Sequence, residues 1–299
     1  KRDRTKVVFN LDGVVVVPVK NVKYLGIWID SKMTYGEHIK KTVEKVNKVT
    51  AALSGVLPNI GGPGYWKRKL LYNAVQSILL FGAPVWYKVI RFQKYRTMQE
   101  SAQRKLLIRV ARAYKTVSTK AVQVIAGIPP IELMVEERAE VYKLGVRAGP
   151  ATTQRPATIG KWQEIWDKHK TTAQWTKKLI PNIAKWLECT HRRADYTLTQ
   201  FLAGYETYGA YTKRIGKKED SSCTYCHEAE DRAEHTFFEC EKWERWRTEI
   251  ELDLNINITP GNVITKMIES PRNWKLIENY RARVIKQKER DERDDTERI

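Results

Sequence analysis

The stretch that decides the fold of the C-terminal part is Cys223-Thr-Tyr-Cys-His-Glu-Ala-Glu-Asp-Arg-Ala-Glu-His-Thr-Phe-Phe-Glu-Cys240. Cys223, Cys226, His235 and Cys240 follow the spacing C-x2-C-x8-H-x4-C. Three thiolates and one imidazole complete the tetrahedron that Zn2+ prefers and leave no position for a water molecule, so the pattern predicts a structural zinc site rather than a hydrolytic one. His227, directly after Cys226, is the competing ligand.

The alternative is that these four residues are unrelated members of a loop. It is weakened because three of the four cysteines of the chain fall within 18 residues. Zinc-ligand spacing in an otherwise cysteine-poor chain indicates a reducing compartment. The remaining cysteine, Cys189, is expected to be a buried thiol.

Charge is distributed unevenly along the chain. Its 299 residues carry a formal net charge of +19, and the first 120 hold 24 Lys and Arg against six Asp and Glu. Such a concentration is typical of a surface that binds an anionic partner, with nucleic acid the first candidate. The last 81 residues hold 14 basic and 20 acidic residues, which disfavours general phosphate binding there. No apolar run reaches the roughly 20 residues of a membrane span, so no membrane partner is expected.

Residue periodicity predicts a mainly α protein with a small β portion. β-branched and aromatic residues at 14–17 and 23–29 predict strands, with Asp12-Gly13 as a hairpin turn. Ile39, Val43 and Val46 recur at helical spacing and start the apolar stripe of a first helix. Further helices are expected at residues 65–81, 92–113, 118–126 and 131–144.

Later segments are less regular. Residues 145–160, rich in Thr, Ala, Gly and Pro, predict a linker. The tryptophans that follow it are expected to be core residues rather than a base-stacking platform. Residues 288–298 are almost continuously charged and predict a solvated, frayed end.

Basic residues crowd the first three helices. A lysine-covered helix face usually serves only solubility, but three such helices in succession favour a nucleic-acid surface. The candidate nucleic-acid-binding residues are Lys40, Lys41, Lys45, Lys48, Lys67, Arg68, Lys69, Arg104, Lys105, Arg109 and Arg112.

Several stretches carry a family resemblance. Lys23-Tyr-Leu-Gly-Ile-Trp-Ile-Asp30 is similar to a polymerase primer-grip strand, and Lys69-Leu-Leu-Tyr-Asn-Ala-Val-Gln-Ser-Ile-Leu-Leu-Phe-Gly-Ala-Pro-Val-Trp86 is similar to a thumb helix and its turn. Thr116-Val-Ser-Thr-Lys-Ala-Val-Gln-Val-Ile-Ala-Gly-Ile-Pro-Pro130 and the zinc ligands complete the pattern. In this order the segments resemble the C-terminal half of a LINE-type, non-LTR retrotransposon reverse transcriptase, of the kind found in insects.

The resemblance implies five regions. They are the end of the palm with the primer grip (1–35), a helical thumb (36–145), a linker with a helical domain (146–210), a CCHC zinc knuckle (211–260) and a charged C-terminal helix and tail (261–299). Tyr24, Leu25 and Gly26 would form the primer grip. The implied process is target-primed reverse transcription, with template RNA, target DNA and an RNA–DNA duplex as partners. The resemblance also implies that the protein is translated in the cytoplasm and acts in the nucleus.

The family's catalytic aspartates are not found in this sequence. Asp294-Asp295 is the only Asp-Asp pair, and it lies in the charged end rather than in a strand. We therefore expect a fragment that is inactive as a polymerase by itself, with no catalytic residue here and with Mg2+ only in the upstream site. Only 59 residues follow Cys240, which favours the lineage whose apurinic-type endonuclease, like the palm and fingers, lies upstream in the polyprotein.

Two other classes remain open from the sequence. One is a non-catalytic nucleic-acid-binding zinc protein derived from such an element. The other is a scaffold whose basic face binds an acidic protein, for which binding to a generic duplex would show little salt dependence.

Overall fold

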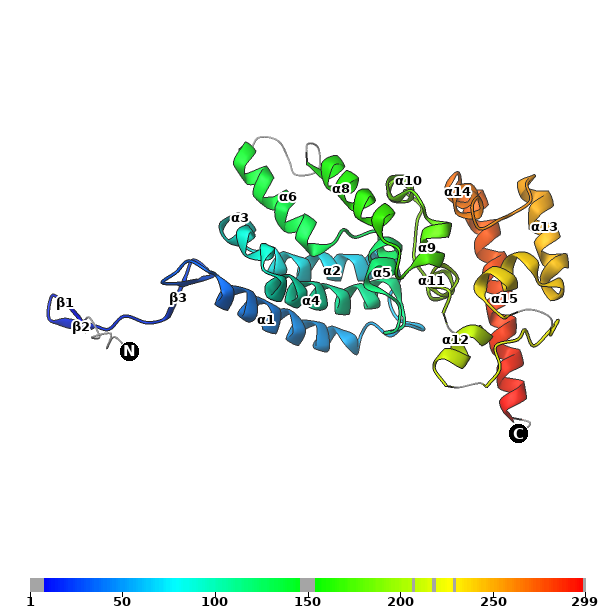
Figure 1. Cartoon of the computed structure of the whole chain (residues 1–299), viewed down its shortest axis with the longest axis horizontal. Coiled ribbons are helices and arrows are strands. Elements are labelled where there is room, and N and C mark those ends of the chain that lie inside the picture. Colours follow the sequence, from blue (N-terminus) through cyan, green and yellow to red (C-terminus); the bar gives the residue numbers. More distant parts are fainter. Residues whose placement is uncertain (1–7, 146–153, 206–207, 217–218, 228–229, 298–299) are drawn as a thin grey trace.

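The computed structural model describes residues 8–145, 154–205, 208–216, 219–227 and 230–297. The described chain is mainly helical, with two small antiparallel sheets, as the sequence predicted. The molecule is elongated: a β-ribbon lies at one end, a helical body in the middle and the C-terminal module at the other end (Figure 1).

The first ribbon joins β1 (Phe9–Leu11) to β2 (Val14–Val16). Asp12 and Gly13 both have positive φ, as a two-residue type I′ turn requires, so the predicted hairpin is confirmed. Every residue of both strands is exposed, and the ribbon stands apart from the helices (Figure 1). Its valines therefore have no core to pack against within the described chain.

A second hairpin replaces the single strand predicted for residues 23–29. β3 (Asn21–Tyr24) and β4 (Ile27–Asp30) pair across a turn at Leu25 and Gly26, whose φ values are 45° and 86°. A Cβ at Gly26 would lie 2.8 Å from the ring of Phe81, so this position needs glycine for its conformation and for this close approach. The prediction of one strand at 23–29 is wrong because the turn at Leu25 and Gly26 lies within a run of apolar residues, and such a run is typical of an uninterrupted strand.

Helices form the body that follows. Their bounds are α1 (Gly36–Ser54), α2 (Tyr65–Leu79), α3 (Ala83–Trp86), the 3-10 turn η1 (Tyr87–Arg91), α4 (Gln93–Ala111), α5 (Thr119–Ala126) and α6 (Ile131–Leu144). α1, α2 and α4 pack against one another, and α5 and α6 pack on α4. The expected apolar stripe of the first helix is buried at Ile39, Val43 and Val46. On α2, Tyr72, Val75 and Leu79 are buried, whereas Leu70 is exposed.

The segment predicted to contain a linker and a helical domain is helical from Arg155 onward. Its helices are α8 (Arg155–Lys168), α9 (Gln174–Leu179), α10 (Ile183–Glu188) and α11 (Tyr196–Ala203). Residues 146–153 of the expected linker lie outside the described residues, and the linker prediction for 155–160 is wrong because Pro156 occupies the first turn of α8, where proline is well tolerated. Trp162, Trp166 and Trp186 are buried, as predicted for core residues.

The C-terminal module contains α12 (Gly209–Arg214), a π-helical turn η2 (His235–Glu239), a 3-10 turn η3 (Glu241–Trp243), α13 (Glu244–Leu254), α14 (Val263–Ile268) and α15 (Pro271–Glu297). α15 packs against α11, α13 and α14. The expected frayed end is wrong for most of its length, because α15 continues to Glu297 and Lys288 on it is buried. None of the described helices combines the length and apolarity that crossing a bilayer requires.

Candidate metal centre and nucleic-acid interface

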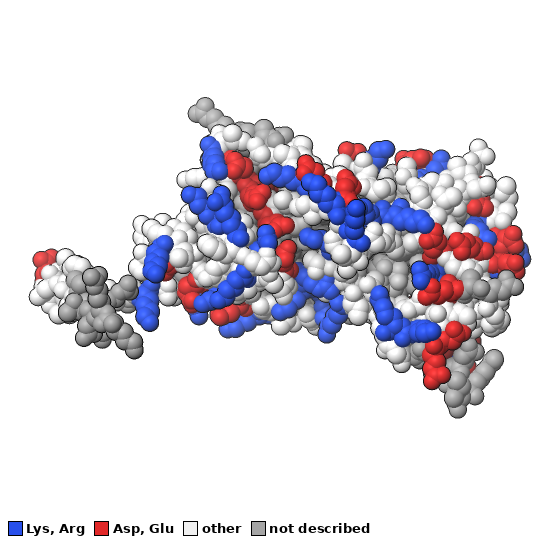
Figure 2. Space-filling view, in the orientation of Figure 1, with Lys and Arg blue, Asp and Glu red and all other residues white. Residues whose placement is uncertain are grey.

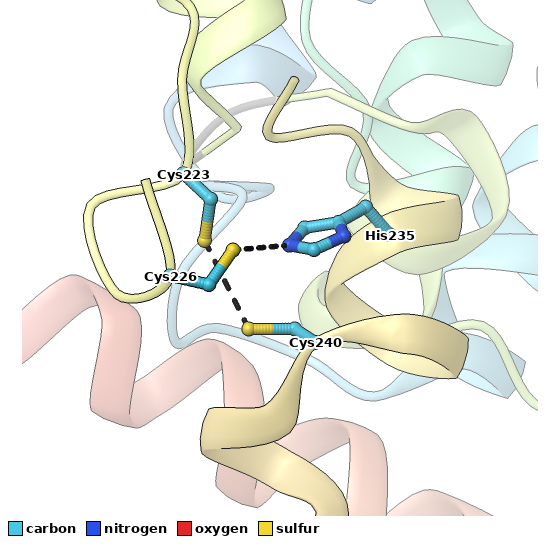
Figure 3. Close-up of side chains that lie close together, drawn as sticks. All are labelled: Cys223, Cys226, His235 and Cys240. Atoms are coloured by element: carbon cyan, nitrogen blue, oxygen red, sulfur yellow. Dashed lines mark hydrogen bonds between the residues drawn. The ribbon is translucent and has the colours of Figure 1, made fainter. Parts of the chain in front are cut away.

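Four side chains converge in the C-terminal module. Cys223 and Cys226 come from a tight loop, His235 begins η2, and Cys240 follows it (Figure 3). The backbone N–H of His227 donates to the carbonyl of Cys223 over 2.9 Å, and that of Cys240 donates to the carbonyl of His235 over 2.8 Å. These two closed turns point the ligand atoms at one centre, and all four atoms lie within 4.8 Å of one another.

The spacing of the ligand atoms suits a tetrahedral ion. Cys223 Sγ and Cys240 Sγ are 3.8 Å apart, and Cys226 Sγ is 3.4 Å from His235 Nε2. Zn–S and Zn–N bonds of about 2.3 and 2.0–2.1 Å at tetrahedral angles give ligand separations of about 3.8 and 3.6 Å. These two separations therefore match a tetrahedral Zn2+ site, and all the ligand atoms lie within 4.8 Å of one another.

Without a cation, the thiolate form of these cysteines is disfavoured. Burial raises the pKa of the Cys240 thiol to about 12, and the neighbouring Cys223 and Cys226 add to the effect. A bound divalent ion would offset that cost because it stabilises the thiolates directly. Glu239 Oε2 lies 3.6 Å from His235 Nδ1 and is placed to orient the ring.

The competing ligand, His227, is not part of this group. It is exposed and has a φ of 60°, directly after the Cys223–Cys226 loop. The four side chains that the structure brings together are therefore those predicted as the first choice from the spacing.

A buried carboxylate that the sequence did not single out joins the knuckle to the last helix. Asp231 accepts hydrogen bonds from the Gly209 backbone N–H (2.8 Å) and from Thr236 Oγ1 (2.8 Å). Lys288 Nζ on α15 donates to its two carboxylate oxygens over 2.9 and 2.8 Å. In the sequence, Asp231 is simply the one Asp between Cys223 and Cys240. Nothing near it indicates that its partner, Lys288, lies 57 residues further along the chain.

Lysines and arginines cover much of the helical body, and acidic residues gather around the C-terminal module (Figure 2). Lys45, Lys48 and Lys67 are exposed, and no described acidic group lies within ion-pair distance of them. Lys40 and Lys41 are paired with Glu37 over 3.6 and 3.9 Å.

The exposed basic residues of α4 lie close to those of α1. Lys105 Nζ donates to Asn47 Oδ1 over 2.9 Å, so exposed lysines from both helices share one surface. Arg109 is half-buried on the same helix. Arg112 takes the left-handed conformation beyond the helix end, and its Nη2 donates to the Pro63 carbonyl over 3.0 Å, so it does not continue the face of Lys105 and Arg109.

Three predicted phosphate contacts are engaged inside the protein. Arg68 is fully buried, and its guanidinium donates to backbone carbonyls that include Pro63 (2.8 Å) and Arg109 (2.7 Å). Arg104 donates to the carbonyls of Lys115 and Val117 and to Thr119 Oγ1. Lys69 Nζ lies over the rings of Tyr65 and Trp66.

The expected primer-grip residues lie at the tip of the second hairpin. Tyr24 and Leu25 are exposed, and Gly26 lines a cavity of about 340 Å3 together with residues of α1 and the end of α2. Lys23, Lys41 and Lys45 contribute cations to this cavity. Burial lowers the pKa of His38, which lines the same cavity, so its imidazole is neutral at pH 7.

Comparisons place the chain beside retrotransposon proteins. It is 26% identical over 226 residues to the 115 kDa protein in type-1 retrotransposable element R1DM of Drosophila melanogaster, covering 69% of this chain and 22% of that protein. It is 24% identical over 278 residues to the retrovirus-related Pol polyprotein from type-1 retrotransposable element R1 2 of Nasonia vitripennis, covering 83% of this chain and 65% of that protein. For the corresponding R1 polyprotein of Bradysia coprophila the identity is 22% over 257 residues, covering 79% of this chain and 25% of that protein. No protein-family profile and no solved structure matches the chain.

Proposed function

This chain is homologous to the Pol polyproteins of insect R1 non-LTR retrotransposons, and on that premise we propose that it is the part that holds nucleic acid during target-primed reverse transcription. The chain spans 22% to 65% of the relatives described above, so the polymerase reaction itself belongs to the intact protein in this proposal. The catalytic aspartates and their Mg2+ would lie upstream, as would the endonuclease.

The observation that carries the proposal is the shared lysine surface of α1 and α4. Lys105 reaches Asn47 over 2.9 Å, which joins Lys45 and Lys48 to the basic side of α4. Exposed cations on rigid helices grip phosphates without reading bases, and this is the behaviour that a template–primer duplex requires of a thumb. Tyr24, Leu25 and Gly26 would contact the primer end at the edge of this surface.

The C-terminal module has a different role in this proposal. Cys223, Cys226, His235 and Cys240 would hold a structural Zn2+ that folds the knuckle. The acidic residues around it disfavour general phosphate binding, so we assign it scaffolding with selective contacts to template RNA or target DNA. The proposed site of action is the nucleus, where integration occurs.

The test is binding of the whole chain to an RNA–DNA duplex over a salt series. A phosphate grip predicts that the logarithm of the association constant falls linearly with the logarithm of salt, by about 0.7–0.9 per phosphate contacted. A flat salt dependence would contradict the proposal and favour an acidic protein partner. Nucleotide incorporation by the pure chain would contradict the assignment of the catalytic site to the upstream part.

A further inference from the structure

A second and larger cavity, of about 680 Å3, lies where the linker domain meets the zinc knuckle. Its wall is built from the start of α5, residues 171–176, the end of α11, α12 and residues 230–234 of the knuckle. The volume is within the range of about 300–1,000 Å3 that is usual for ligand sites. Neither the metal centre nor the lysine surface uses this cavity.

Aromatic rings line the cavity and are held in place. Trp175 Nε1 donates to the Phe201 carbonyl over 2.7 Å, and the Tyr211 hydroxyl lies 2.9 Å from Thr116 Oγ1. Tyr205 and Tyr211 meet edge to face, with ring centroids 5.0 Å apart. These hydrogen bonds hold the Trp175 ring against α11 and the Tyr211 ring against Thr116 without any ligand.

Gly204 makes this arrangement possible. It ends α11 with a φ of +68°, and a Cβ there would lie 2.9 Å from the Trp175 ring. A larger residue would displace the indole from the cavity wall.

Arg214 supplies the positive charge. Its guanidinium lies 5.0 Å from the ring centroid of Tyr205 and 5.1 Å from that of Tyr211. Lys178 is paired with Glu234 and Arg232 is paired with Glu230, whereas Arg214 has no acidic partner among the described residues. The Arg214 guanidinium therefore offers a planar surface for stacking and a positive charge that can bind an anion.

The cavity lies next to a segment that contacts α4. Arg104 on that helix donates to Thr119 Oγ1 over 3.1 Å, and Thr119 is next to Ser118, which lines the cavity. A helix that would hold the duplex therefore contacts the rim of the cavity.

We propose that the cavity binds an unpaired nucleobase of a single nucleic-acid strand, with Tyr205 and Tyr211 as the stacking platform and Arg214 contacting the adjoining phosphate. Bases that have left a duplex stack on aromatic rings and on Arg planes, and such stacking tolerates any base. The inference rests on the proposed function, because it assumes that nucleic acid is already held on the neighbouring helices.

The experiment uses the whole chain with three probes: a blunt RNA–DNA duplex, the same duplex with a six-nucleotide overhang, and the six-nucleotide strand alone. The overhang and the strand are made as RNA and as DNA, which distinguishes the two sources of the base. Affinities are measured by fluorescence anisotropy for the wild type, Tyr211→Ala, Arg214→Ala and the control Tyr211→Phe. The control keeps the ring and removes only the hydroxyl that meets Thr116.

We expect the wild type to prefer the overhang to the blunt duplex, and both Ala variants to lose roughly tenfold in affinity for the overhang and the free strand. Tyr211→Phe should retain the preference, and blunt-duplex binding should be the same in all four proteins. Equal binding of blunt and overhang probes by the wild type would overturn the inference. An undiminished preference in Arg214→Ala, whose side chain is exposed, would also overturn it. If the wild type does not bind the blunt duplex, the proposed function is contradicted. In that case the affinity of the free strand for the wild type and the Ala variants still tests whether the cavity binds a base.

Discussion

Asp231, within the Cys223–Cys240 segment, and Lys288 of α15 form an ion pair in which both residues are buried, with exposures of 2% and 3%. The pair is not isolated, because Lys288 Nζ also lies over the rings of Tyr208 and Tyr225. Tyr225 in turn donates its hydroxyl to Asp291 Oδ2 over 2.6 Å. The last helix is thus an integral part of the knuckle and not an appendage to it.

Removing the cation of this pair should destabilise the module strongly. Lys288→Met leaves a buried carboxylate without its counter-charge, which costs about 3 kcal/mol of unfolding free energy. Denaturant unfolding followed by tryptophan fluorescence measures this loss. Lys286→Met, an exposed position on the same helix, is the matched control and should change stability by less than about 0.5 kcal/mol. Equal effects of the two substitutions would show that the pair does not hold α15 to the knuckle.

Loss of the metal should unfold one end of the molecule only. Cys226→Ser, or a strong chelator added to the wild type, should abolish stoichiometric zinc binding and make residues beyond about 208 sensitive to protease. The α1–α6 body should stay resistant because the four ligands all lie outside it, between Cys223 and Cys240. Zinc analysis by mass spectrometry and limited proteolysis check this. Cys189→Ser is the control, since Cys189 is not in the ligand group, and zinc retention by Cys226→Ser would exclude that thiol as a ligand.

Two neighbours on α2 should give opposite phenotypes. Arg68 is buried and donates to the carbonyls of the 57–63 loop, so Arg68→Ala should cost about 3 kcal/mol in stability because buried carbonyls lose their donors. Lys67 is exposed, so Lys67→Ala should leave stability unchanged and weaken duplex binding slightly. Thermal unfolding and duplex affinity measured on both variants separate the roles. If Arg68→Ala is as stable as the wild type but binds the duplex more weakly, Arg68 contacts the duplex and does not stabilise the fold.

Charge reversal on the shared lysine surface should affect binding without affecting folding. Lys45→Glu, Lys48→Glu and Lys105→Glu together should reduce duplex affinity and lower the salt slope by roughly two to three units. Lys275→Glu, Lys286→Glu and Arg290→Glu change net charge equally on the distant helix α15 and serve as the control. If both triple variants lower the slope alike, the effect reflects total charge and not a defined surface.

Acid should weaken the junction between α11 and α15. Asp195 caps α11 and binds Arg281 over 2.7 Å; burial acts to raise its pKa, but the charge and hydrogen bonds of Arg281 lower it from 3.8 to about 2. A depressed carboxyl pKa contributes stability that is complete above the unfolded value and is lost as pH falls through the folded value. About a third of the Asp195 side chain is exposed, so solvent screens part of this contribution.

The corresponding measurement compares the wild type with Asp195→Asn at several pH values. We expect a difference in unfolding free energy of about 2 kcal/mol at pH 7 that shrinks between pH 4 and 2. Loss of zinc in acid affects both proteins and cancels in the difference. A difference that is constant down to pH 2 would show that Asp195 acts only as a neutral cap.

Local sequence signals predicted what is local in the structure. The helix expected at residues 131–144 has those bounds because its apolar spacing is regular and Gly145 follows it. The convergence of the Cys3His group was predictable because metal coordination would fix the spacing of its members. The Asp12-Gly13 turn was predictable because few residues adopt positive φ. Sequence and structure agree at these positions because one constraint decides each of them.

The failures concern residues whose partners are distant in sequence. Lys67, Arg68 and Lys69 look alike in the sequence, but only Arg68 reaches the carbonyls that α4 brings near. Lys288 looks like one charge among many until the fold brings Asp231 to it. Tertiary packing decides such positions, and the cavity at Tyr205 and Arg214 is assembled from five segments that no local pattern connects.

The exposed β1–β2 ribbon has a practical consequence for handling the protein. Both faces of the ribbon are exposed, and neither of its outer edges pairs with another described strand. This is the geometry through which strands pair with one another. Purified alone at high concentration, the chain should self-associate through this ribbon, and oligomers would mimic cooperative binding in a titration. Affinity work therefore belongs at low protein concentration, with the particle mass verified by light scattering in the same buffer.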